Sequence, residues 1–278
     1  MSTIYKSEAG GNEIRRRYRE ALADWPVPAE HLRVPTREGE TFVVASGPAD
    51  APPLVLLHGS GANTTMWQGD AASWARHFRT YAVDLIGEPG LSAPSRPPLG
   101  SDAYALWLDD VLDGLGITAA SIVGASLGGW MAVDYATRRP ERVTRLALLC
   151  PGGLGRQTMG WLFTALLLRP FGRWGIRRSA RTVTGLDTPQ AGPVLDNLVV
   201  TFRQFKPRTG LPVFPDDALR RLAMPVLVIA GGDDVMFDSA DTARRVRQCV
   251  PHAAVTILPG VGHAILGQTG PVLAFLRE

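Results

Sequence analysis

Short apolar runs alternate with amphipathic stretches along most of this chain. Residues Pro53–Leu57 (PLVLL) form a continuous apolar run between proline and glycine, which is typical of a strand buried on both faces. Further extended or apolar runs occupy Leu32–Pro35, Thr41–Ala45, Thr80–Asp84, Ser121–Gly124, Leu146–Cys150, Pro225–Ala230 and Val255–Pro259. Helical periodicity is found between them at Met66–His77, Asp102–Leu115, Ser126–Arg138 and Asp238–Cys249. The alternation predicts an α/β fold, with a mostly parallel sheet covered by helices on both sides.

Two segments depart from this alternation. Glu13–Trp25 carries an apolar stripe on a basic helix, and we expect that stripe to pack against the domain rather than to touch a membrane. Pro151–Pro215 is rich in Gly, Pro, Trp and Arg and contains no clear strand. It predicts a helical cap, residues 151–215, inserted after the sixth strand. Residues 1–150 and 216–278 would then form the core, with the N-terminal helix at about 12–25.

Composition narrows the class of protein. The 278 residues are 45% hydrophobic and 20% charged, which excludes disordered, collagen-like and coiled-coil chains. Cys150 and Cys249 lie in no metal-ligand spacing, so neither a metal site nor a disulfide framework is expected. The N-terminus lacks the apolar stretch of a secretory signal, and the longest strongly apolar run, Trp161–Leu168, is far too short to span a bilayer. We therefore expect a cytoplasmic protein without integral membrane association.

The charge is unevenly distributed. A net charge of +3 does not suggest a nucleic-acid partner. Residues 151–215 contain nine Arg or Lys against two Asp, a net +7, which leaves the remainder at −4. A solvated face of the cap helices would account for this. The alternative is that a basic cap steers anionic acyl substrates, or an anionic surface, towards the core.

The strongest chemical signal is a G-x-S-x-G motif between a predicted strand and a predicted helix. Gly124, Ser126 and Gly128 supply it within SIVGASLGG. In that context the motif forms a sharp turn that exposes a serine hydroxyl at the edge of the sheet. The helix N-terminus places backbone N–H groups where an oxyanion would form. We interpret Ser126 as a nucleophile.

A serine nucleophile needs a base and an acid that orients the base. Of the five histidines, His263 is favoured because it follows a strand in a glycine-rich loop, LPGVGH. The acid is expected after the strand that ends at Ala230, where Asp233 and Asp234 are adjacent. We choose Asp234, with Asp233 as the alternative, because the loop Cys150–Gly153 after the preceding strand holds no carboxylate.

A second glycine-rich turn, His58-Gly59-Ser60-Gly61, follows the Pro53–Leu57 strand. Such a turn can present a backbone N–H to a substrate carbonyl oxygen. We assign the N–H groups of Ser60 and Leu127 as oxyanion donors. We interpret His58 as a structural histidine of the loop, and Asp84 as an acid that binds the backbone of its own turn.

These motifs, H-G-S-G, D-x-x-G-x-x-G-x-S, G-x-S-x-G-G, G-x-x-D and G-H in this order, resemble the α/β-hydrolase fold. The resemblance extends from about Leu32 to the end and is closest to small bacterial carboxylesterase-like serine hydrolases with a helical cap. It implies an eight-stranded type of sheet, with Ser126 as nucleophile, Asp234 as acid and His263 as base. One departure is an extra residue at Glu88-Pro89 in the second motif.

The resemblance implies a hydrolase acting on a small-molecule carboxylic ester without a metal or an organic cofactor. Two alternatives stay open: a C–C bond hydrolase of vinylogous keto acids, and a ligand receptor or regulator on the hydrolase fold. The base must be neutral, so kcat/KM is expected to rise through a pKa of roughly 6 to 7. The sequence does not predict the physiological substrate or the oligomeric state. Aromatic residues of the cap, such as Trp161, Phe163, Phe171 and Trp174, are expected in its core or lining the pocket.

Overall fold

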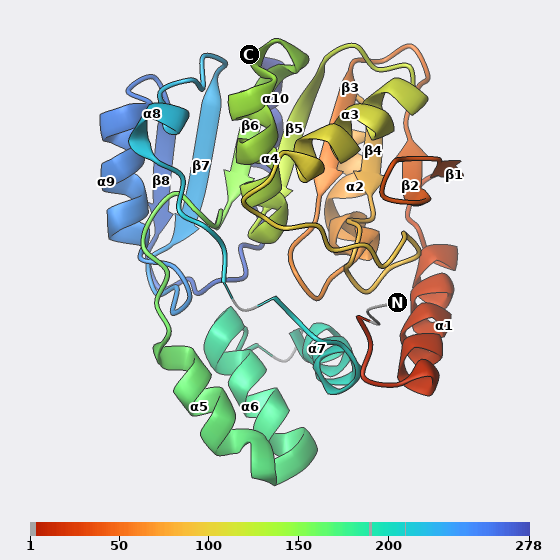
Figure 1. Ribbon diagram of the computed structural model, residues 1–278, viewed down its shortest axis with the longest axis vertical. Coiled ribbons are helices and arrows are strands. Elements are labelled where there is room, and N and C mark those ends of the chain that lie inside the picture. The colour runs from red at the N-terminus through yellow and green to blue at the C-terminus, as the bar shows by residue number, and fades with distance from the viewer. Residues whose placement is uncertain (1–3, 189–190, 209) are drawn as a thin grey trace.

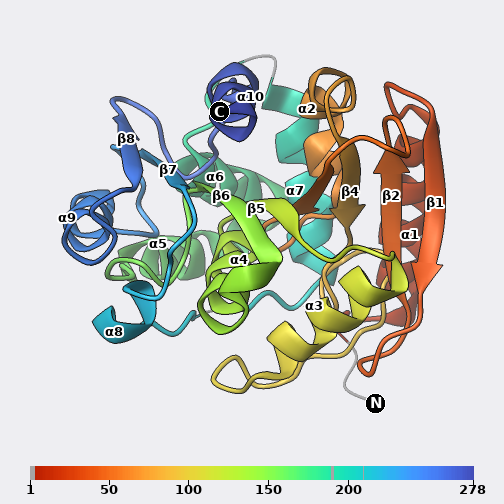
Figure 2. The same ribbon diagram turned by 90° about the horizontal axis from the view of Figure 1, so that it is seen from above.

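The computed structural model describes residues 4–188, 191–208 and 210–278 and contains one eight-stranded sheet (Figures 1 and 2). The strands lie in the order β1-β2-β4-β3-β5-β6-β7-β8. Their bounds are β1 Ala29–Val34, β2 Thr41–Ser46, β3 Pro53–Leu57, β4 Arg79–Val83, β5 Ala120–Ala125, β6 Val143–Leu149, β7 Val226–Gly231 and β8 Ala254–Leu258. Only the pairs made by β2 are antiparallel. The predicted α/β class with a mostly parallel sheet is confirmed.

Helices cover both faces of this sheet. They are α1 Glu8–Ala23, α2 Gln68–Trp74, α3 Ala103–Gly114, α4 Leu127–Arg138, α8 Asp216–Leu219, α9 Ser239–Cys249 and α10 Thr269–Arg277. Short 3-10 helices η1 (Thr64–Trp67) and η2 (Pro140–Arg142) complete this part of the chain. Side chains of α3, α4, α8 and α9 share one apolar cluster, whereas those of α1, α2 and α10 share the other.

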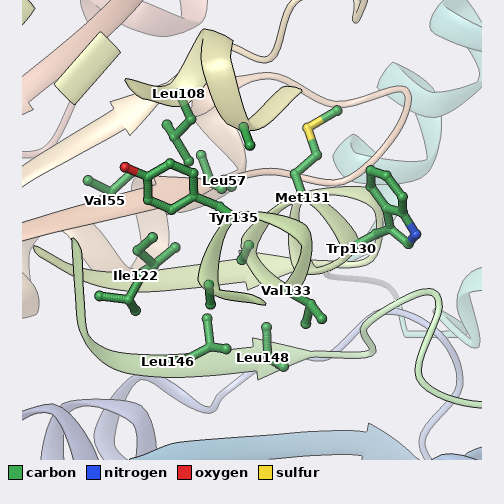
Figure 3. Packing of buried hydrophobic residues seen from close by; sticks show 14 of the residues in the cluster. Val55, Leu57, Leu108, Ile122, Trp130, Met131, Val133, Tyr135, Leu146 and Leu148 are labelled. Atoms are coloured by element: carbon green, nitrogen blue, oxygen red, sulfur yellow. The ribbon is translucent and has the colours of Figure 1, made fainter. Parts of the chain in front are cut away.

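The central strands alternate between the two clusters. Val55 and Leu57 of β3 belong to the cluster beneath α3 and α4, whereas Leu54 and Leu56 belong to the opposite one. This is the two-residue periodicity of a strand whose two faces are both buried. Figure 3 shows the first cluster, where side chains of α4 lie over those of β3, β5 and β6. The buried sheet is therefore a rigid platform for the loops at the ends of its strands.

The regular elements in the described residues of the predicted insertion are helices. They are α5 Gly160–Leu168, η3 Arg169–Phe171, α6 Gly172–Thr184 and α7 Gly192–Gln204, and no strand is assigned among these residues. Figure 1 shows α5 and α6 as a hairpin at the far end of the molecule from the C-terminus. Among the described residues, no helix is both long and apolar enough to cross a membrane.

Several element bounds differ from the sequence-based expectation. Helix α1 begins at Glu8 rather than near residue 12, because the Ser7 hydroxyl accepts a hydrogen bond from the N–H of Gly10 and caps the helix there. The expected helix Met66–His77 is divided into η1 and a shorter α2 that ends at Trp74. Helices α8 and α10 were not predicted.

Candidate active site

Ser126 occupies a strained turn between β5 and α4. Its backbone angles are φ 50° and ψ −108°, outside the regions that residues with a side chain normally adopt. The turn is held by a hydrogen bond from the Ser126 N–H to the Leu149 carbonyl and by one from the Trp130 N–H to the Ser126 carbonyl. A strained turn with its hydroxyl at the end of a central strand is the geometry expected of the G-x-S-x-G motif.

The two glycines of the motif are required by close backbone contacts. A Cβ atom on Gly124 would lie 2.6 Å from the carbonyl oxygen of Gly128. One on Gly128 would lie 2.1 Å from the carbonyl oxygen of Leu57 and 2.5 Å from that of His58. Strand β5, helix α4 and the loop after β3 therefore meet at backbone distance, which only glycine allows.

The structure brings Ser126, His263 and Asp234 together although they lie far apart in the sequence. In the neutral ring, His263 Nε2 accepts a hydrogen bond of 2.9 Å from Ser126 Oγ, and Nδ1 donates one of 2.7 Å to Asp234 Oδ2. Asp234 Oδ1 accepts from the N–H groups of Met236 and Phe237, so the carboxylate is fixed by its own loop. The alternative acid, Asp233, is exposed to solvent.

The surroundings of His263 shift the pKa of its imidazole. Burial by itself lowers the pKa of the imidazole, but the Cys150 thiol and the Asp234 carboxylate outweigh it, and the net pKa is raised. Cys150 follows β6, and its φ of 39° is the only other positive value at a described non-glycine residue. No local pattern in the sequence indicates that Cys150 influences His263.

The H-G-S-G loop lies directly beside Ser126. A Cβ atom on Gly59 would be in contact, at 3.5 Å, with the Cβ of Ser126. His58 is fully buried and donates from Nδ1 to the Gly59 carbonyl, while its Nε2 accepts from the Leu85 N–H. Burial lowers the pKa of His58 to about 4, so it is neutral and serves to shape the loop.

The two expected oxyanion donors lie in the elements on either side of Ser126, the loop after β3 and helix α4. Leu127 begins helix α4 and Ser60 is the third residue of the loop. Within the part of the chain that the structure describes, neither backbone N–H has a protein acceptor. The Leu127 N–H, at the start of α4, is a group of the kind that binds negative charge at helix N-termini.

Asp84 accepts hydrogen bonds from other elements as well as from its own turn. It accepts hydrogen bonds from the N–H groups of Leu91 and Thr64 and from the Tyr18 hydroxyl of α1. Burial raises the pKa of this carboxyl to about 6, against the lowering effect of these hydrogen bonds. Asp84 thus joins α1, η1 and the loop after β4 behind the H-G-S-G turn.

Glu88 is a second buried acid beside the same turn, and sequence reasoning assigned it no role. Its Oε2 accepts from the Gly61 N–H at 2.8 Å and from the Ser60 hydroxyl at 3.0 Å. The Arg96 guanidinium lies 3.8 Å from Oε1. Burial raises the pKa of Glu88 to about 7, although the Gly61 N–H, Arg96 and Ser60 all favour the ionised form. The only signal in the sequence was the extra residue at Glu88-Pro89.

The inserted helices reach the site through the His263 loop. Helix α6 ends at Thr184 and is followed by Gly185, whose φ is 73°. A Cβ on Gly262 would lie 2.8 Å from the Cα of Gly185. The Thr184 carbonyl accepts from the Ala264 N–H at 2.9 Å. The position of the histidine loop is therefore coupled to α6. In the described residues, no group of three or more His, Cys, Asp or Glu is placed to hold a metal ion.

Comparison with known proteins agrees with this geometry. The sequence model of the α/β hydrolase family matches residues 54–275. Carboxylesterase YbfK of Bacillus subtilis is 34% identical over 275 residues, which cover 95% of this chain and 92% of YbfK. The crystal structure of that carboxylesterase, CesB (YbfK), matches 97% of this chain and 96% of its own with a TM-score of 0.82 and 33% identity. The crystal structure of naproxen esterase from Bacillus subtilis matches 98% of each chain with a TM-score of 0.82 and 30% identity. The chain belongs to the α/β-hydrolase family.

Proposed function

We propose that this protein is a carboxylic ester hydrolase that works through an acyl-enzyme on Ser126. The observation that carries the proposal is the hydrogen-bonded series Ser126–His263–Asp234, with its nucleophile on a strained turn. Relatives that match almost the whole chain are named carboxylesterases, which supports the same reaction.

Each residue has a defined part in the reaction. Ser126 Oγ adds to the carbonyl carbon of the ester while its proton passes to His263 Nε2. Asp234 holds the ring through Nδ1 and stabilises the imidazolium that forms. The Nε2 proton then goes to the departing alkoxide, which leaves the acyl group on Ser126.

Water completes the cycle by the same route. It gives a proton to His263 Nε2 as its oxygen adds to the acyl carbon, and Ser126 recovers the proton as the acid leaves. The N–H groups of Ser60 and Leu127 stabilise the oxyanion in both steps. Loss of one such donor typically raises the barrier by about 3 kcal/mol.

Hydrolysis of p-nitrophenyl acetate and butyrate tests the proposal. Wild type should turn over both esters and react covalently with a fluorophosphonate probe, whereas Ser126→Ala should do neither. Ser101→Ala, a change at a loop serine, is the matched control and should keep both properties. Equal inactivity of wild type and Ser126→Ala across acyl chain lengths would overturn the proposal.

A further inference from the structure

The α5–α6 hairpin, residues 160–184, exposes an unusual amount of apolar side chain. Helix α5 (GWLFTALLL) is apolar on all sides, yet none of its residues is buried. Five large side chains of the hairpin are 62–75% exposed: Phe163, Leu166, Leu167, Phe171 and Trp174. Such aromatic residues are expected in the cap core or lining the pocket, and this exposure excludes the cap core for Phe163, Phe171 and Trp174. A helix that is apolar all round is normally covered, and an exposed apolar patch of this kind marks a surface that binds something.

The same hairpin is strongly cationic. It carries five arginines, Arg169, Arg173, Arg177, Arg178 and Arg181, and no Asp or Glu. Arg177 and Arg181 pair with acids beyond the hairpin, Asp196 and Asp187. Among residues that the structure describes, no ion pair is found for Arg169, Arg173 or Arg178, which are all exposed. These three cations are therefore available to an external anion.

The positive charge of the α5–α6 hairpin indicates what binds to its exposed apolar side chains. A second copy of the chain would bring two acid-free, arginine-rich hairpins together, and their repulsion would oppose burial of the apolar side chains. An anionic bilayer fits both features, because the interface accepts Phe, Leu and Trp while lipid phosphates accept arginine. Phe171 and Trp174 contact each other edge to face at the turn of the hairpin, beside Arg169 and Arg173.

We propose that the α5–α6 hairpin docks this protein on the surface of an anionic lipid bilayer. The apolar side chains at the turn enter the interface, and Arg169, Arg173 and Arg178 bind the headgroup phosphates. In Figure 1 the hairpin lies at one end of the molecule, where a flat surface can approach it. The docking belongs to the hairpin and does not depend on the chemistry at Ser126.

Co-sedimentation of the full chain with vesicles tests the docking. Vesicles of phosphatidylcholine with phosphatidylglycerol should bind the protein, pure phosphatidylcholine vesicles should bind it much more weakly, and high salt should release it. The triple variant Arg169→Gln, Arg173→Gln, Arg178→Gln should bind anionic vesicles at least tenfold more weakly. That loss follows from about 1 kcal/mol per cation near the surface. The double variant Phe171→Ser, Trp174→Ser should bind weakly even at low salt.

A matched control separates docking from net charge. The triple variant Arg76→Gln, Arg221→Gln, Arg247→Gln removes three exposed arginines from the rest of the molecule and should bind like wild type. All variants should keep the wild-type circular dichroism spectrum and hydrolysis of p-nitrophenyl butyrate in buffer without vesicles. The proposal would be overturned if the protein bound both kinds of vesicle equally or bound neither. It would also be overturned if the two triple variants weakened binding equally. So would a dimer in solution that Phe171→Ser, Trp174→Ser abolishes.

Discussion

At the scale of single residues, the site depends on how its titratable groups are buried. His263 lies between Ser126 and Asp234, and Cys150 and Asp234 together raise its pKa. A base acts only when it is neutral, so a raised pKa moves the acid limb of the activity profile to higher pH. From the sequence alone we expected this limb at a pKa of roughly 6 to 7, the range of an unperturbed histidine.

The pH dependence of kcat/KM for a neutral ester is the corresponding prediction. Wild type should gain activity through a limb that lies above the ordinary histidine range. Cys150 and Asp234 both raise this pKa. Asp234→Asn removes one of the two groups, so its limb should move to lower pH while kcat falls by about a thousandfold or more. Asp233→Asn, at the exposed neighbour, should leave the profile unchanged. A limb at the same pH in Asp234→Asn and wild type would show that Asp234 does not set the pKa of the base.

Glu88 gives a prediction about stability as well as rate. Its pKa of about 7 exceeds that of an unfolded glutamate, so the folded state binds the proton more tightly and stability falls as pH rises from about 4 to 7. Glu88→Gln removes this penalty, and its melting temperature relative to wild type should rise between pH 5 and pH 8. The free energy involved is at most about 3 kcal/mol.

The same variant should lower kcat about tenfold with little change in KM, because an amide cannot accept from Gly61 and Ser60 as strongly as a carboxylate does. Thermal melts and ester kinetics across pH measure both effects. Glu141→Gln, at an exposed position, is the control and should show neither. A melting-temperature difference that is independent of pH would contradict a buried, titrating Glu88.

At the scale of elements, the site depends on loops that meet at backbone distance. Gly262→Ala should separate the His263 loop from Gly185, because the added Cβ would meet only backbone atoms, which cannot rotate away. We expect kcat/KM to fall by about a hundredfold, since a misplacement of about 1 Å costs that much. Gly192→Ala, in open space at the start of α7, should keep wild-type kinetics. Parallel ester assays and melting curves distinguish a displaced loop from a variant that is merely unstable.

Elements that are specified locally could be predicted from the sequence. The turn at Ser126 is encoded by Gly124 and Gly128, and strand β3 by the apolar run PLVLL between proline and glycine. Helix α10 was missed because its sequence, TGPVLAFLR, includes glycine and proline in its first turn and is short. Its helical state depends on packing of Val272, Phe275 and Leu276 against the sheet, which no local pattern reports.

The features of the site that could not be predicted depend on contacts between residues far apart in the sequence. The order of the motifs was enough to choose Ser126, His263 and Asp234, since each follows a recognisable strand. The burial of Glu88 and the position of Cys150 depend on how the loops after β3, β4 and β6 pack together. A carboxylate in a loop is usually solvated, so the burial of Glu88 beside the H-G-S-G turn could not be predicted from local sequence.

At the scale of the whole molecule, the N-terminal segment ties the inserted helices to the core. Tyr5 pairs with Phe205 at the end of α7, and the backbone of Lys6 bonds to the Gln204 carbonyl. Farther along α1, the Tyr18 hydroxyl bonds to Thr64 and Asp84 of the core. Helix α1 therefore bridges two parts of the molecule that the chain itself connects only through residues 150–160 and 205–216.

Phe205 is the centre of this junction. It is fully buried against Ile4 and Ile14 of the N-terminal segment, and the Arg96 guanidinium of the core lies 5.0 Å from its ring centre. Phe205→Ala should therefore lower the free energy of unfolding by about 3 to 5 kcal/mol, the usual cost of a large cavity. Phe163→Ala removes the same ring from an exposed site and should cost about 0.5 kcal/mol or less.

Denaturant unfolding of the two variants, followed by circular dichroism, measures the difference. Because Phe205 contacts all three parts, its loss should also weaken ester hydrolysis, through Arg96 and Glu88, more than Phe163→Ala does. If Phe205→Ala unfolded at the same denaturant concentration as Phe163→Ala, the ring would not be holding the N-terminal segment, the inserted helices and the core together.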